Sequence, residues 1–355
     1  MKILGKAKQI ERHLRTSIER GRWKPGEAIP PERELCADLG VSRVALRDAL
    51  MALTNDGLLI RRQGSGTFVA ESVGQRQVSM LCTLDDLMSG QRFFTRAVIE
   101  ELKQRAEDHG YKGMLGVGQG KTGKDVIDSV SALDPTHAQN MAGAILITRM
   151  PPVVHDHLEK LNIPFVTVDV NLKTSDHEIL LDYSAMVNLG ARVLREAGQE
   201  DFAIMAFGDS SLEHESPLSI IESSQDACLS AVNNDTKRII LVPVDHPELA
   251  GSIFANWWQR TDRPNALFFT DDVLCDMSCQ TISKLGISVP DDLMFISESS
   301  TANRFHFAKK IACLEFSVPQ LADATWDLLD DLIHGRLPSK PVRRIQPVYR
   351  PGETL

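Results

Sequence analysis

From about residue 77 onward, short apolar runs alternate with segments of helical pattern. The apolar runs are Val78–Cys82, Ala144–Ile147, Phe165–Val168, Phe202–Phe207, Ile239–Val242, Ala266–Phe269 and Leu293–Ile296, and the helical segments include Phe93–His109, Val153–Leu161, Ala185–Glu196 and Val273–Leu285. Strands that are buried on both faces and alternate with helices indicate an α/β domain with a parallel sheet. Because this alternation runs too long for one sheet of ordinary width, we expect two doubly wound parallel sheets with a cleft between them.

Polar residues near the carboxyl ends of these runs are candidate ligand contacts, since ligands of such folds collect at that edge of the sheet. Carboxylates there accept hydrogen bonds from the hydroxyls or amines of a ligand. The alternative for any one of them, such as Asp85 or Asp271, is that it only caps the following helix. The candidates, with Phe93 at the start of a helical segment, are Thr83, Asp85, Phe93, Asp169, Asp182, Asp271, Asp272, Ser297 and Glu298.

The formal net charge of −9 hides an uneven distribution of charge along the chain. Residues 1–70 hold 13 lysines and arginines against 8 acidic residues, whereas residues 71–355 hold 26 against 40. A basic segment suits phosphate groups, and the acidic remainder does not. Nucleic acid is therefore the first partner to consider for the N-terminal 70 residues.

The same 70 residues carry the signals of three short helices. The first is expected over residues 6–20, the second begins with Pro31 at its first position and ends at Gly40, and Ser42 caps the third. Apolar residues recur at helical spacing along the first and third helices. They are Ala7, Ile10, Leu14 and Ile18 in the first, and Leu46, Ala49, Leu50 and Leu53 in the third.

Two arginines of the third helix are candidates for reading bases. Arg43 and Arg47 lie four residues apart and therefore share a face near the helix N-terminus, beside the buried stripe. A guanidinium fork matches the O6 and N7 acceptors of guanine in the major groove, and a lysine would not read them as well. The alternative is that both arginines lie on a solvated helix face.

A glycine-tipped hairpin is expected after the third helix. Residues 58–61 and 67–70 have the pattern of two strands, which Gln63-Gly64-Ser65-Gly66 closes. Because the tip has almost no side-chain bulk, its backbone can approach the sugar-phosphate chain or enter a minor groove, with Arg61 and Arg62 behind it. Taken alone, the hairpin could be only a tight turn, but three helices followed by a hairpin on a basic segment favour a DNA-binding wing.

This N-terminal segment resembles the winged helix-turn-helix of the GntR family of bacterial transcription regulators. The residues that carry the resemblance are Gly21, Lys24-Pro25-Gly26, Ile29–Leu35, Val41-Ser42-Arg43, Arg47–Leu50, Gly57-Leu58 and Gln63–Val69. The resemblance implies operator binding by a dimer, with Arg33, Ser42, Arg43 and Arg47 on the DNA and the wing residues Arg61, Gln63, Gly64, Ser65 and Gly66 at the minor groove. One departure is Pro31, which stands where the family has a small polar helix cap.

The remainder, residues 77–355, resembles the effector domain of LacI/GalR-type repressors. The resemblance rests on Gly110-Tyr111, Ala142–Leu146, Leu161–Val166, Thr270–Leu274, Leu285–Leu293 and Tyr349–Thr354. It implies that Asp272 matches the family's effector-binding aspartate and that Asp182 matches its crossover aspartate. Two departures are Ser219–Gln225, which lacks the family's clamping arginine, and Ser297–Ser300, which replaces a Gly-Phe-Asp-Asp loop. These changes favour polyols, neutral sugars or an amine-bearing ligand over acidic ligands.

Other functional classes find little support in the sequence. An aminotransferase domain would need a longer chain and a recognisable Schiff-base lysine, and Gly116–Gly120 lacks the spacing of a dinucleotide-binding loop, so it reads as a flexible strand end. His155 and His157 lie two residues apart on a helix, where side chains diverge, so solvated histidines are favoured over a metal site. The six scattered cysteines fit free thiols in a reducing cytoplasm, and no apolar run reaches the length of a membrane span.

The sequence therefore predicts a winged helix-turn-helix domain (α+β) at residues 1–70, a linker at residues 71–76 and a two-lobed α/β effector-binding and dimerisation domain at residues 77–355. The predicted function is that of a cytoplasmic transcription regulator, a repressor, which binds a palindromic double-stranded operator as a homodimer. Its expected effector is a sugar-like small molecule in the cleft, with no cofactor, metal or membrane. The alternatives are a non-carbohydrate metabolite or a metal as effector and, more remotely, a fused enzyme.

Overall fold

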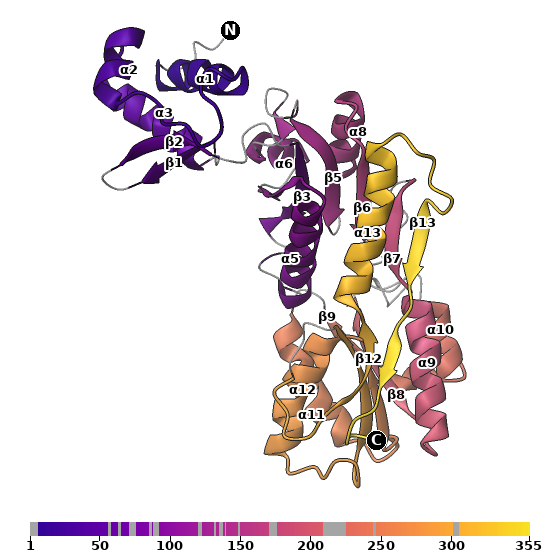
Figure 1. Ribbon diagram of the computed structural model, residues 1–355. Coiled ribbons are helices and arrows are strands. Elements are labelled where there is room, and N and C mark those ends of the chain that lie inside the picture. The colour runs from indigo at the N-terminus through magenta and orange to yellow at the C-terminus, as the bar shows by residue number, and fades with distance from the viewer. Residues whose placement is uncertain are drawn as a thin grey trace. The chain divides into compact units, whose positions relative to one another are not determined.

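The computed structural model describes residues 6–55, 58–62, 65–70, 76–84, 87, 92–119, 123–130, 133–134, 138, 140–147, 150–169, 176–208, 225–243, 246–300 and 305–355. The chain forms two compact units (Figure 1). The first comprises the residues up to Arg76 together with Gly110–Lys112, and the second comprises Gln77–His109 and Gly113–Leu355.

The first unit contains three helices and a hairpin: α1 (Lys6–Glu19), α2 (Glu32–Leu39), α3 (Arg43–Asn55), β1 (Leu59–Arg62) and β2 (Gly66–Val69). The two strands are antiparallel, with Leu59 opposite Val69 and Arg62 opposite Gly66. Residues 26–29 run along the other edge of β2, where the Ile29 amide donates to the Thr67 carbonyl at 2.9 Å. The core is built from every element and comprises Ile10, Leu14, Ile18, Trp23, Ile29, Leu35, Leu46, Ala49, Leu50, Leu53, Leu58, Leu59 and Val69.

The ends of α2 and α3 follow the expected capping chemistry with one correction. Gly40 ends α2 in the left-handed conformation, with φ 62°, and the Ser42 hydroxyl accepts from the Ala45 amide at 3.3 Å. Pro31 is the N-cap residue of α2 and not its first helical residue, because its ψ of 149° is extended. A proline offers no side-chain acceptor there, so Glu32 and Glu34 in the first turn are the acidic complement to the helix dipole.

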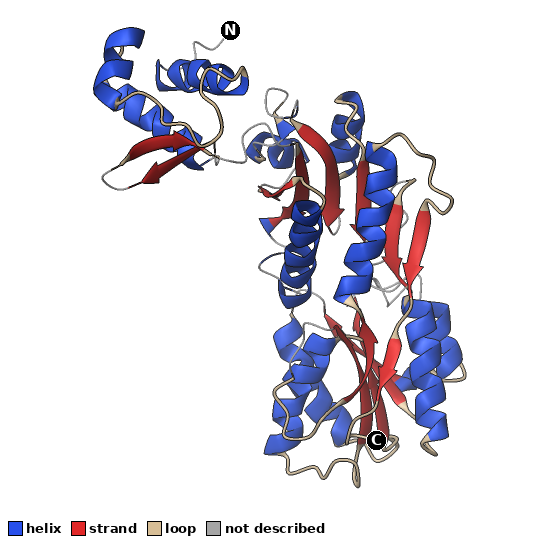
Figure 2. Cartoon of the chain, viewed as in Figure 1, coloured by secondary structure: helices blue, strands red, loops and turns tan. Residues whose placement is uncertain are grey.

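The second unit consists of two lobes, each built on a six-stranded sheet with helices on both faces (Figure 2). The sheet of lobe 1 has the order β13-β7-β6-β5-β3-β4, and that of lobe 2 has the order β14-β12-β11-β10-β8-β9. The strands of lobe 1 are β3 (Gln77–Thr83), β4 (Lys112–Gly118), β5 (Met141–Ile147), β6 (Phe165–Asp169), β7 (Glu178–Leu181) and β13 (Val342–Ile345). Those of lobe 2 are β8 (Ala203–Gly208), β9 (Ile239–Pro243), β10 (Ala266–Phe269), β11 (Met294–Ser300), β12 (Ala312–Phe316) and β14 (Val348–Arg350).

The helices that cover the two sheets alternate with the strands along the chain. They are α5 (Arg92–Asp108), α6 (Gly123–Ser129), α8 (Pro152–Lys160), α9 (Tyr183–Glu196), α10 (Gln225–Ala231), α11 (Ala250–Trp258), α12 (Asp272–Lys284) and α13 (Val318–Ile333), with short 3₁₀ turns at Thr236–Arg238 and Pro247–Leu249. Within each lobe every strand pair whose direction is defined is parallel, except the antiparallel pair of β12 and β14. The predicted two-lobed α/β fold is confirmed.

Each of the seven predicted apolar runs overlaps a strand of the second unit, and five strands of that unit lack such a run. In β4 the run is interrupted by glycines that packing requires: a Cβ on Gly116 would lie 2.6 Å from a methyl of Leu81 and 2.9 Å from one of Val130. Gly116 is thus a packed strand residue and not part of a flexible end. In β12 buried and half-buried residues alternate, so its apolar pattern is diluted as well. Three of the five missed strands, β4, β13 and β14, lie at the edges of their sheets, whereas β7 and β12 lie inside them.

Three short crossings connect the two lobes. The chain passes from β7 to α9 through Asp182, from β12 to α13 through Ser317, and from β13 to β14 through Gln346 and Pro347. The Asp182 and Ser317 side chains cap the helices that follow, accepting from the amides of Ala185 and Gln320. The side-chain amide of Gln346 also donates to the Asp182 carboxylate at 2.8 Å, and this hydrogen bond joins the first crossing to the third.

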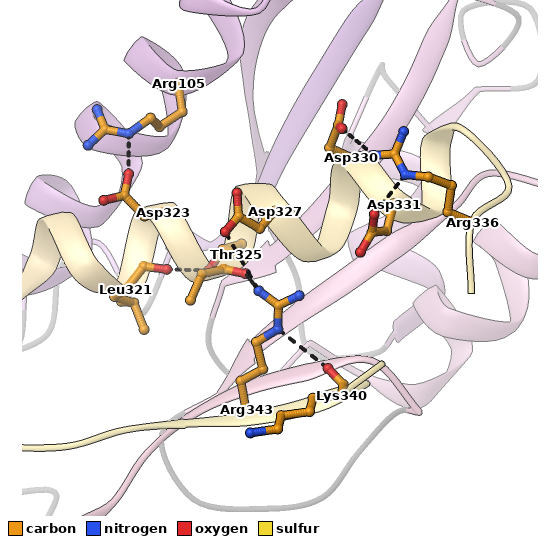
Figure 3. Close-up of polar contacts among 11 residues, drawn as sticks. Arg105, Leu321, Asp323, Thr325, Asp327, Asp330, Asp331, Arg336, Lys340 and Arg343 are labelled. Carbon is orange, nitrogen blue, oxygen red and sulfur yellow. Dashed lines mark hydrogen bonds and ion pairs between the residues drawn. The ribbon is translucent and has the colours of Figure 1, made fainter. Parts of the chain in front are cut away.

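Ion pairs join helix α13 to α5 and to β13 of lobe 1 (Figure 3). Arg105 of α5 donates to Asp323 at 2.6 Å, and Arg343 of β13 lies 3.9 Å from Asp327. Near the helix C-terminus, Arg336 donates to Asp331 at 2.8 Å. Because α13 also packs on β5, β6 and β7, it belongs to lobe 1 although it follows a strand of lobe 2 in the sequence.

Candidate DNA interface and ligand cleft

Helix α3 presents an exposed face that bears both arginines of the sequence prediction. Arg43 and Arg47 are exposed, and the Arg47 side chain is 67% exposed, while Leu46 and Leu50 face the core. Val44, between the two arginines, is 71% exposed. An apolar side chain at that place can contact the methyl group of thymine. The sequence pattern does not indicate Val44 as a candidate contact, because a valine in a helix is read first as a core residue.

The Glu32 carboxylate links Arg47 of α3 to Arg61 of the hairpin. Glu32, in the first turn of α2, accepts from Arg47 Nε and from Arg61 Nη2, each at 2.9 Å. The hydrogen bond and charge of Glu32 raise the pKa of Arg47 above its ordinary value. Glu32 therefore contacts two predicted DNA-binding residues at once. The sequence pattern does not indicate this link, since nothing in a linear pattern pairs residues 15 and 29 positions apart.

The described part of the hairpin agrees in form with the predicted wing. Arg61 lies opposite Thr67, and the Ser65 amide donates to the Arg62 carbonyl at 3.0 Å. Gly66 has φ 117°, a conformation that strongly favours glycine. The Arg62 guanidinium stacks over the ring of Phe68, 4.7 Å from its centroid. Two predicted wing contacts, Gln63 and Gly64, lie outside the described residues, and Arg33 is exposed on α2.

In lobe 2, two acidic residues converge at the carboxyl edge of the sheet. Asp271 caps α12 by accepting from the Val273 amide at 2.9 Å, so the capping alternative holds for this residue. Asp272 follows it, and its amide donates to the carboxylate of Glu298 at 3.2 Å. Glu298 is 9% exposed, and burial together with the charges of Asp272 and Asp271 raises its pKa well above the ordinary value for glutamate.

The sequence prediction placed Ser297 and Glu298 after the strand, and this is wrong. Strand β11 extends to Ser300 because Ile296 to Ser300 pair with Ala312 to Phe316 of β12. Hydroxyl and carboxyl side chains thus replace apolar ones inside a buried strand. Glu298 nevertheless lies beside Asp272, whose amide donates to its carboxylate.

The candidates of lobe 1 are less completely defined. Thr83 is the last residue of β3 and is half-buried, and Asp169 is the last residue of β6. Asp85, and the side chains of Phe93 and Asp169, lie outside the described residues, as does the segment 219–224. Asp182 caps α9 and also accepts from Gln346, so both of its carboxylate oxygens are engaged at the crossing. A role of these residues in ligand binding stays a prediction.

The chain matches two protein families in separate regions. Residues 6–69 match the bacterial regulatory proteins of the gntR family, and residues 191–355 match the periplasmic binding protein-like domain. The histidine utilization repressor of Klebsiella aerogenes is 34% identical over 112 residues, which are 32% of this chain and 46% of that protein. The chain therefore spans less than half the length of that curated relative. None of the helices in the described part of the chain could cross a membrane.

Solved structures of LacI-family proteins share the fold of the second unit. A LacI family transcriptional regulator from Enterococcus faecium with bound ribose has a TM-score of 0.59 at 14% identity, over 78% of this chain and 98% of that one. The lac repressor dimer bound to operator and an anti-inducer has a TM-score of 0.58 at 15% identity, over 79% of this chain and 94% of that one. The chain thus joins a region that matches the gntR family of bacterial regulatory proteins to a region that matches the periplasmic binding protein-like domain.

Proposed function

We propose that this protein is a ligand-responsive transcription repressor that binds a palindromic operator as a homodimer. The observation that carries the proposal is the exposed arginine face of α3 beside Arg61 of the hairpin, on a chain that also holds a two-lobed binding-protein fold. This combination of domains resembles the arabinose repressor AraR. The proposal extends to a sugar-like effector but names no individual sugar.

On the DNA side, α3 enters the major groove with its N-terminal turn. Arg43 and Arg47 donate to guanine, and Val44 contacts a neighbouring thymine methyl. The hairpin with Arg61 and Gly66 approaches the adjacent phosphates or minor groove, where it fixes the register without reading bases. The basic N-terminal residues supply the attraction that the acidic second unit cannot.

On the ligand side, the chemistry of Asp272 and Glu298 fits hydroxyl groups. Burial and the charges of Asp272 and Asp271 raise the pKa of Glu298 well above its ordinary value, and in its protonated form a carboxyl group can donate to a hydroxyl oxygen. An ionised aspartate beside it only accepts. One donor and one acceptor at adjacent positions match a sugar or polyol hydroxyl, which both donates and accepts.

Coupling between ligand and DNA follows from the three crossings. A ligand that contacts both lobes favours one arrangement of Asp182, Ser317 and Gln346 over others. If that arrangement changes the separation of the two DNA-binding domains in a dimer, ligand affinity and operator affinity are linked reciprocally.

The experiment is a thermal melting screen of the full chain against sugars, polyols and other metabolite classes. We expect a sugar or polyol to raise the melting temperature, and the same compound to change operator affinity in a fluorescence anisotropy titration. Asp272→Asn should abolish the stabilisation, and Glu200→Gln, an exposed acidic residue of the same lobe, should keep it. Stabilisation only by another metabolite class would contradict the sugar assignment, and a full response of Asp272→Asn would show that the ligand binds elsewhere.

A further inference from the structure

The exposed face of α3 carries an acidic side chain, Asp48, in addition to the two arginines. An α-helix turns by about 100° per residue, which places Val44 and Met51 opposite the buried residues and Asp48 beside Val44, one turn further along. Asp48 is exposed, and Met51 is 58% exposed. The outer face of α3 therefore offers a carboxylate as well as guanidinium groups.

No role within α3 explains an aspartate at this position. Asp48 lies beyond the first turn of the helix, where an acidic side chain would interact favourably with the helix dipole. Aspartate is also a weak helix former. The residues three and four positions away are all apolar, so no basic neighbour on the helix surface can pair with it. They are Val44, Ala45, Met51 and Ala52.

Contacts with other elements do not explain Asp48 either. Within the described part of the chain, its carboxylate has no hydrogen bond and no ion pair. Glu32 differs, since it binds Arg47 and Arg61 at 2.9 Å each. A carboxylate without a partner, on a helix that lies against DNA, repels the phosphates and lowers affinity unless it meets a hydrogen-bond donor there.

The major groove supplies that donor from only two bases, through N4 of cytosine and N6 of adenine. A carboxylate has acceptors only and pairs with cytosine N4, whereas adenine also presents the N7 acceptor and is matched better by an amide. Thymine and guanine present acceptors, O4 in one and N7 and O6 in the other, and a carboxylate repels them. A carboxylate thus selects cytosine by attraction and rejects thymine and guanine by repulsion.

We propose that Asp48 is a specificity-determining residue, which accepts a hydrogen bond from N4 of a cytosine in each half-site of the operator. This inference rests on the proposed function, because it requires α3 to lie in the major groove. Asp48 lies about 6 Å along the helix axis from Val44, a distance of about two base steps. The cytosine therefore lies within about two base pairs of the thymine that Val44 contacts.

The test selects duplex DNA from a random library with the full chain in four forms. These are the unmodified protein, Asp48→Asn, Asp48→Ala and Asp38→Asn. Asp38 is an exposed aspartate of α2, so its variant removes the same charge from the same domain and is the matched control. Because both side chains are exposed, neither substitution disturbs the core.

We expect the unmodified protein and Asp38→Asn to enrich the same two-fold symmetric sequence, with a cytosine in each half-site that the Asp48 variants do not require. Asp48→Asn should replace that cytosine by adenine, because an amide pairs with N6 and N7 of adenine. Asp48→Ala should accept all four bases there. In anisotropy titrations, changing this base pair should weaken binding of the unmodified protein about fivefold per half-site, and that of Asp48→Ala less than about twofold.

Pyrimidin-2-one, a cytosine analogue that lacks the 4-amino group, gives the chemical control. At this position it should weaken binding of the unmodified protein more than that of Asp48→Ala, since only the first loses a hydrogen bond. Equal weakening of the two would overturn this inference alone, as would enrichment of the same cytosine by both Asp48 variants. Recovery of no common sequence by the unmodified protein would overturn the proposed function together with this inference.

Discussion

Replacing Glu32 by glutamine tests whether this carboxylate positions Arg47 and Arg61, the two proposed DNA contacts that it binds. In the free protein Glu32 shares one negative charge between Arg47 and Arg61, at 2.9 Å from each. The three side chains together carry a net charge of +1, and Glu32→Gln raises that to +2. The glutamine side chain has nearly the same shape and cannot hold both guanidinium groups.

The change in DNA affinity can be worked out from this charge. Each neutralised phosphate contributes about −0.9 to the slope of log K against log salt concentration. One additional contact in each subunit of a dimer steepens the slope by about 1.8, so affinity for random DNA falls about 12-fold more between 50 and 200 mM salt. The ratio of operator affinity to random-DNA affinity should decrease. A guanine contact provides roughly fivefold to 150-fold discrimination, and we expect about a tenfold loss when Arg47 is no longer held.

The assay is fluorescence anisotropy of the full chain on its selected operator and on random duplex DNA at several salt concentrations. Glu34→Gln is the matched control, because Glu34 lies in the same first turn of α2 and is exposed. It removes the same charge and the same interaction with the helix dipole. We expect Glu34→Gln to keep the ratio of specific to random affinity and Glu32→Gln to lower it. Equal ratios and equal salt slopes for the two variants would refute the positioning role.

Three further predictions concern the second unit. The pKa of Glu298 is raised in the folded state, so the free energy of unfolding falls as pH rises from the ordinary glutamate pKa toward the raised one. Glu298→Gln should therefore be more stable than the unmodified protein at pH 8 but not at pH 5. Urea unfolding at both pH values checks this. Gln346→Leu removes the hydrogen bond that links two crossings, and it should change the ligand dependence of operator affinity more than the melting temperature, as parallel anisotropy and melting measurements would show. Phe254→Ala opens a cavity in the core of lobe 2 and should cost about 3–5 kcal/mol of unfolding free energy, measured by urea titration.

The sequence predicted the features that depend on local periodicity and composition. The stripe of Leu46 and Leu50, the cap at Ser42 and the buried strands follow from such patterns, and the structure contains all of them. The two-lobed α/β fold was predictable for the same reason, since long alternation of buried strands and helices leaves few other solutions.

The remaining features depend on contacts between distant parts of the chain. The Glu32 link to Arg61 joins residues 29 positions apart, and the burial of His155, which corrects the expectation of a solvated histidine, depends on Phe165 of a neighbouring strand. The extension of β11 through Glu298 requires pairing with β12, which contradicts the rule that buried strands are apolar. Such residues break local patterns, and breaks of this kind are expected where a site is built.

Selection of double-stranded DNA from a random library by the full chain tests the central claim most directly. We predict enrichment of a two-fold symmetric sequence with guanines in each half-site, and loss of that enrichment for a variant that carries both Arg43→Ala and Arg47→Ala. This variant should still retain weak binding to random DNA. Recovery of no common sequence by the unmodified protein, or of the same sequence by the double variant, would contradict the assignment of α3 as the element that reads the operator.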